Sequence, residues 1–184
     1  DNFVRQQIAG DLNGTVETKL GTGFLALGPT FRTDGGDADS AASAKSETLD
    51  DRVDTLTRGL LGVTVACARC HDHFYDPITT EDYHAMAGIF ASVSMDSRKV
   101  GDRTFHVVKE SKVQDLNVFV RGNVEEKGPV VPRGFLKVLA RGGERRTFAE
   151  GSGRRELAEA IADPENPLTA RVMVNRMWGE LFGV

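Results

Sequence analysis

Both cysteines of the chain lie in a single pentapeptide, which begins at Cys67 and ends at His71. One pair of cysteines three residues apart cannot cross-link distant segments of 184 residues, so a disulfide framework is excluded. The fold must therefore come from the packing of its secondary structure, together with any group that the pentapeptide binds. The pentapeptide is the feature that most limits what this chain can be.

The spacing of the pentapeptide, C-x-x-C-H, is typical of c-type haem attachment. In that chemistry two thiols, here Cys67 and Cys70, form thioether bonds to the haem, and the next residue, His71, is an axial iron ligand. We therefore expect haem c as the cofactor and electron transfer, with a redox partner protein, as the function. Arg69 lies between the cysteines, which places it either near a haem propionate or on an exposed helix surface.

Other interpretations of this region stay open. Four zinc-type ligands occur within seven residues: Cys67, Cys70, His71 and His73. With Asp72 or Asp76 as the base, they would form a zinc-dependent enzyme acting on cell-surface polysaccharide. The third interpretation is a redox dithiol or an unmodified cysteine pair. A structural or adhesive module, in which haem only stabilises the fold, is a further alternative, and the sequence leaves open whether the chain is an enzyme.

The sixth ligand of a haem iron has several candidates beyond the pentapeptide: Met86, His84, Met95 and His106. An open or water-bound position is the remaining possibility. His73 is a poor candidate for the same iron, because two residues span only about 7 Å, too little to pass around the porphyrin. It is instead a candidate ligand for the haem of a neighbouring subunit in a homo-oligomer, or a contact to a propionate.

Apolar residues at three- and four-residue spacing predict a chain that is mainly α. The predicted helices are 1–12, 15–27, about 47 to the cysteines, 81–92, 152–162 and 167 onward. The third of these places the pentapeptide at the end of a helix. The small, polar stretch 33–44 predicts a loop.

Two short segments, 105–110 and 116–122, are predicted to be strands. The expected fold class is therefore mainly α, with a small helical c-type-haem-like module, a short two-stranded segment and a C-terminal helical pair. The expected layout is a pentapeptide-carrying module over 1–96, a linker with short strands over 97–130 and a C-terminal helical segment over 131–184.

Charge and hydropathy limit the partners. The formal net charge is −4, so nucleic acid is not expected as a partner. The sequence contains no run of eighteen apolar residues, so we expect no membrane span in this chain.

Several long blocks resemble a known family. The block GLLGVTVACARCHDHFYDPITTEDYHAMAGIFAS resembles the planctomycete cytochrome-like domain of unknown function, as do DNFVRQQIAGDL and GTGFLALGP. The blocks VFVRGNVEEKGPVVPRGFLKVL and GSGRRELAEAIADPENPLTARVMVNRMWGELFG resemble the C-terminal planctomycete-specific domain that accompanies it.

The resemblance implies a periplasmic or cell-surface protein that carries haem and is associated with polysaccharide. Members of the family usually have a far longer segment between the GIF and VRGN blocks than the roughly thirty residues found here. The chain also begins and ends inside family blocks, so we expect it to be a fragment with a truncated C-terminal domain.

Overall fold

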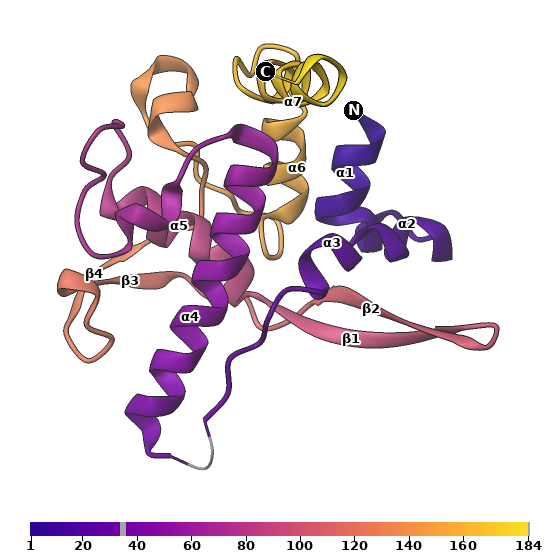
Figure 1. Cartoon of the computed structure of the whole chain (residues 1–184). Helices are drawn as coiled ribbons and strands as arrows, with labels where there is room; N and C mark the ends of the chain where they lie inside the picture. The colour runs from indigo at the N-terminus through magenta and orange to yellow at the C-terminus, as the bar shows by residue number, and fades with distance from the viewer. Residues whose placement is uncertain (34–35, 184) are drawn as a thin grey trace.

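The computed structural model describes residues 1–33 and 36–183, which form helices and two small sheets (Figure 1). The first four helices are α1 (Asn2–Ala9), α2 (Val16–Gly21), α3 (Gly23–Ala26) and α4 (Ala38–Leu56). They are followed by α5 (Thr80–Ala91), α6 (Arg154–Ile161) and α7 (Thr169–Phe182). The strands are β1 (Val93–Val100), β2 (Arg103–Glu110), β3 (Leu116–Phe119) and β4 (Lys127–Val131).

The expected fold class, mainly α, is wrong. Helices account for about 51% of the chain and strands for 15%, so the fold is a mixture of helix and strand. Segment 105–110 lies within a strand, and the predicted strand 116–122 is a strand only over 116–119, because 120–122 form a 3₁₀ turn. Each strand pairs with one that the sequence pattern did not predict. β2 pairs with β1 and β3 with β4, giving two separate antiparallel sheets.

The two missed strands have physical reasons to escape a pattern search. β1 is largely exposed and rich in polar residues, because β2 is the strand of the β1–β2 hairpin that packs against α2 and α3 (Figure 1). Gly101, with φ of +59°, allows the tight turn that reverses the chain. β4 contains Gly128 and Pro129, residues that are rare in strand interiors but tolerated at an edge.

Helix α4 begins earlier and ends sooner than the sequence predicts. Asp37 caps its start by accepting a hydrogen bond from the Ser40 amide (2.9 Å), so most of the predicted loop 33–44 is helical. Residues 34–35 of that loop lie outside the described residues. After Leu56 the chain makes one π-helical turn, and Gly62, with φ of +67°, ends it. The pentapeptide is therefore not at the end of this helix, but in a separate turn.

The core lies between α4 and α5 and between α1 and α6, which pack against each other in these pairs. Its fully buried side chains include Ile8, Val53, Leu56, Met86, Ile89, Leu157 and Ile161. The capping box of Thr79 and Asp82 fixes the start of α5. Asp82 also accepts from the Lys137 amide and from Arg145 Nε, so one buried carboxylate ties α5 to a distant loop.

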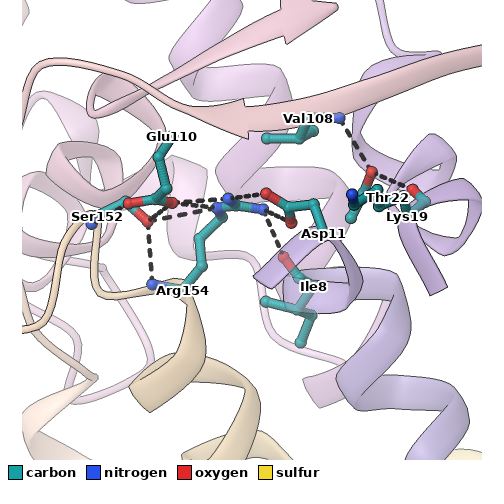
Figure 2. Close-up of polar contacts among 8 residues, drawn as sticks. All are labelled: Ile8, Asp11, Lys19, Thr22, Val108, Glu110, Ser152 and Arg154. Carbon is teal, nitrogen blue, oxygen red and sulfur yellow. Dashed lines mark hydrogen bonds and ion pairs between the residues drawn. The ribbon is translucent and has the colours of Figure 1, made fainter. Parts of the chain in front are cut away.

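A buried arginine in the C-terminal part of the chain forms an ion pair with an aspartate near the N-terminus (Figure 2). Arg154, the first residue of α6, is fully buried and donates two hydrogen bonds to Asp11 (2.6 and 2.7 Å). It also donates to Glu110 at the end of β2 (2.7 Å), whose carboxylate accepts from Ser152 as well. Segments more than a hundred residues apart are thereby fixed to one another.

Among the described residues, no helix is both long and apolar enough to cross a membrane.

Candidate functional site

Cys67 lies in a short 3₁₀-helix, Val65–Arg69, and Cys70 is the residue directly after that helix. Side chains three residues apart eclipse one another in a 3₁₀-helix. Val65 and Ala68 accordingly share one side and are fully buried, while Cys67 and Cys70 share another side and are exposed. The helix type therefore places both thiols together on the surface of the protein.

The imidazole of His71 is exposed and held by one hydrogen bond. Its Nδ1 lies 2.8 Å from the carbonyl oxygen of Asp72, so Nδ1–H donates and Nε2 is left as the nitrogen with a free lone pair. Histidines that bind metals are commonly held in this way, because the second hydrogen bond fixes the tautomer and raises the basicity of the ligating nitrogen. His71 thus has the chemistry of an axial ligand.

His73 is a structural residue of the loop that follows. Its side chain is only 7% exposed, and Nδ1 accepts hydrogen bonds from the amides of Tyr75 (3.2 Å) and Asp76 (2.8 Å). Nε2 lies 3.0 Å from the hydroxyl of Thr64. Both ring nitrogens are therefore engaged inside the protein, which does not favour His73 as a ligand to a second haem.

The zinc-type ligands do not converge. Asp72 accepts from the amide (2.8 Å) and hydroxyl (3.1 Å) of Thr80 and so caps α5, and His73 is engaged as described. In the part of the chain that the structure describes, no three His, Cys, Asp or Glu side chains are arranged to hold a metal ion.

The candidates for the sixth ligand are scattered. Met86 is fully buried in the core. Met95 and His106 lie on the β1–β2 hairpin, where His106 Nδ1 is 3.3 Å from the hydroxyl of Ser97. α5, which carries Met86, packs against the 3₁₀-helix of the pentapeptide, but the Met86 side chain itself is enclosed in the core.

His84, the fourth candidate, is buried and fully bonded. Nδ1 donates to the Thr80 carbonyl (2.8 Å), and Nε2 accepts from the amide of Phe119 (3.1 Å). Burial lowers the pKa of His84, because it disfavours the charged imidazolium. The neutral ring connects α5 to β3, and this leaves no nitrogen for iron.

Arg69 turns toward α4 rather than toward solvent. It is partly buried, and its Nη1 lies 4.0 Å from Oδ2 of Asp50. Three buried polar atoms of this region have no hydrogen-bond partner: Asp50 Oδ1, Arg69 Nε and the Tyr83 hydroxyl. Burial raises the pKa of Asp50, and the nearby Tyr83 and Arg69 oppose that shift.

A turn from a distant part of the chain lies against Cys70, and the sequence did not predict this contact. The turn Val120–Gly122 packs directly on Cys70, and a Cβ placed on Gly122 would overlap Cys70 Sγ. Gly122 has φ of +79°, and the preceding Arg121 is the one described non-glycine residue with a positive φ, +53°. No sequence signal links Cys70 to a turn some fifty residues later, although the positive φ requires glycine locally.

The neighbouring loop adds two exposed rings, Phe74 and Tyr75, which the sequence analysis did not single out. Together these elements form a surface site: two thiols, one free imidazole nitrogen, a turn against one thiol, and an aromatic pair. The residues fit a group that is bonded through two sulfurs and ligated by one histidine.

The fold and site define a protein of mixed helix and strand with an exposed C-x-x-C-H turn. Residues 1–95 match the model of the PSCyt2 family, a protein of unknown function (DUF1549). Because this match covers more than half of the chain, the chain belongs to that family. Residues 153–184 match PSD1, also a protein of unknown function (DUF1553). The resemblance to these planctomycete-type domains is confirmed at the level of the family.

No curated protein and no solved structure matches the chain. Arg154 falls in the PSD1 match and its partner Asp11 in the PSCyt2 match, so the buried ion pair joins the two matched segments.

Proposed function

We propose that this chain binds one covalent haem of the c type through Cys67 and Cys70, with His71 as an axial ligand, and transfers electrons to or from a redox partner protein. One observation carries the proposal. The 3₁₀-helix presents both thiols on one exposed side, and the next residue holds an imidazole whose Nε2 has no protein partner. The haem iron, when bound, would supply the one-electron chemistry.

The chain's own residues prepare the attachment site. Val65 and Ala68 anchor the turn in the core, so the thiols opposite them are held outward at fixed positions. The Asp72 carbonyl holds the proton on Nδ1 of His71 and orients the ring. Gly122 allows the backbone to approach Cys70 closely and so covers one side of the site.

The sixth position is proposed to be open or water-bound. Met86 and His84 are committed to the core and to backbone hydrogen bonds, and Met95 and His106 belong to the extended hairpin. An open position makes the haem responsive to added ligands, so cyanide or imidazole should shift its Soret band.

Thioether attachment is normally completed outside the cytoplasmic membrane, so the proposed location is the periplasm or the cell surface. Polysaccharide at that surface and a homo-oligomeric state are further proposals that follow from the resemblance.

The test is a pyridine haemochrome spectrum of denatured protein that was produced together with a c-type haem maturation system. The account predicts a c-type spectrum and colour that stays with the protein in acid acetone. The His71→Ala variant, which keeps both thiols, should retain covalent colour but lose the native axial-ligand spectrum.

Colour that washes out in acid acetone contradicts the proposal, as does stoichiometric zinc without iron. A Soret band that no reductant changes would indicate a haem that stabilises the fold and would contradict electron transfer.

A further inference from the structure

An exposed aromatic pair follows the pentapeptide directly. Phe74 is 82% exposed and Tyr75 is 87% exposed, the highest values among the large apolar side chains that the structure describes. Their ring centroids lie 4.9 Å apart in an edge-to-face arrangement. Single exposed apolar residues are common on protein surfaces, but two adjacent aromatic rings form a patch that binds other molecules more readily than polar surface does.

The loop that carries the pair is held at both ends. The His73 ring accepts from the amides of Tyr75 and Asp76, and the backbone amide of His73 donates to the carbonyl of Ile78 (2.8 Å). Asp72 fixes the start of the loop to the first turn of α5 through Thr80. The rings are therefore directed outward by a bonded backbone, and their exposure does not come from a frayed segment.

We infer that Phe74 and Tyr75 form an apolar wall against the face or edge of a tetrapyrrole attached at the pentapeptide. The inference rests on the proposed function and specifies which surface covers the group. Phe74 is three residues from His71, a span of at most about 11 Å, so the pair is within reach of a group bonded there. A tetrapyrrole is a large flat apolar body, and the rings supply apolar area that would otherwise remain in water.

In this arrangement His73 is a positioning residue. It does not touch the iron, and its two accepted amide hydrogen bonds hold the backbone from which both rings project. This role uses the buried imidazole that the sequence analysis treated as a candidate ligand.

Tyrosine labelling gives a direct test, because the chain has only two tyrosines and the other, Tyr83, is 2% exposed. Acetylation by N-acetylimidazole, located by peptide mass spectrometry, therefore reports on Tyr75 with Tyr83 as an internal control. The unloaded reference is the full chain with Cys67→Ala and Cys70→Ala, in which no thioether can form. Tyr75 should be labelled about tenfold or more slowly in the haem-loaded chain than in this reference.

A second measurement uses the loaded chain with Phe74→Ala, and Phe3→Ala, another exposed aromatic substitution, as the matched control. Because loss of apolar cover exposes the haem to water, Phe74→Ala should lower the reduction potential and speed Tyr75 labelling, while Phe3→Ala leaves both unchanged.

The outcomes separate the two proposals. If intact mass shows no haem on the wild-type chain, the proposed function falls and this inference with it. If haem is attached but Tyr75 is labelled equally fast in loaded and unloaded chains, only the wall is overturned. Protection of Tyr75 that appears only after a partner protein is added would also overturn it, since the pair would then be a docking surface for protein.

Discussion

At the scale of single residues, the site depends on positions where an imidazole or a glycine has one particular task. His71, His73 and His84 occur within fourteen residues, yet only His71 keeps a ring nitrogen without a protein partner. Composition alone ranks the three equally, because each offers the same donor atoms. The three histidines differ in the hydrogen bonds that their ring nitrogens form in the folded chain.

Gly122→Ala is predicted to impair haem attachment. The new Cβ would overlap Cys70 Sγ, so either the turn or the thiol must move. Gly142→Ala is the matched control, because Gly142 has a similar φ (+83° against +79°) and nothing within 4 Å of the added atom. The fraction of chains carrying covalent haem, measured by intact mass, should fall for Gly122→Ala and stay at the wild-type level for Gly142→Ala. Equal loading of the two variants would show that the approach of Gly122 to Cys70 is irrelevant.

At the scale of elements, the ends of helices and turns decide where the pentapeptide lies. α4 and the π-helical turn after it stop at Gly62, and the separate 3₁₀-helix that follows carries the cysteines. The backbone at Gly62 approaches α7 closely, where a Cβ would lie 2.7 Å from Cγ2 of Val172. Val172 is β-branched, so few side-chain rotamers are available that would move its Cγ2 away from an added Cβ.

Gly62→Ala should therefore destabilise the protein by roughly 2–3 kcal/mol, the sum of left-handed strain and overlap with α7. Gly101→Ala, with φ of +59° and open space around it, should cost only the strain, about 1 kcal/mol. Urea unfolding of both variants measures the difference. A smaller loss for Gly62→Ala than for Gly101→Ala would contradict the close packing of α7 on this turn.

The sequence pattern predicted those elements whose signals are local. The helix at 81–92 was found because its apolar period lies inside it, and the structure places it at Thr80–Ala91. The strands β2 and β3 were found, but their partners were not, because pairing depends on turns and on exposed polar strands. The pentapeptide was found from its spacing, while the contact of Gly122 with Cys70 and the exposure of Phe74 depend on the folded chain.

At the scale of the whole molecule, one buried network holds the PSCyt2-matched part to the PSD1-matched part. Arg154 donates to Asp11 in one direction and to Glu110 in the other (Figure 2). Removing the arginine would leave Asp11 without its ion-pair partner and Glu110 with Ser152 alone, and breaking a buried pair in this way typically costs about 3–5 kcal/mol. The apolar face of α7, in contrast, is exposed, with Val174, Met177, Trp178 and Leu181 at the surface.

The network predicts lower stability in acid. Burial alone would raise the pKa of Glu110, but the hydrogen bonds from Ser152 and Arg154 outweigh it and the pKa is lowered. A carboxylate with a lowered pKa in the folded state stabilises the protein above its unfolded value, near 4.5, and this contribution is lost as the pH falls below it.

Glu110→Gln should therefore reduce the free energy of unfolding at pH 7 and flatten its decline below about pH 4.5. The exposed Glu17→Gln is the control and should follow the wild-type curve. Urea unfolding at pH 7, 5, 4 and 3 measures both variants, and a Glu110→Gln curve that stays parallel to the wild-type curve down to pH 3 would exclude this network as the source of acid lability.

The central claim is a covalent bond between haem and the thiols of Cys67 and Cys70. Its most direct test is the intact mass of the denatured chain, purified after production with a haem maturation system, beside the variant with Cys67→Ala and Cys70→Ala. The account predicts a mass increment of one haem on the wild-type chain and none on the variant. A wild-type chain with its bare sequence mass and two free, alkylatable thiols would contradict it.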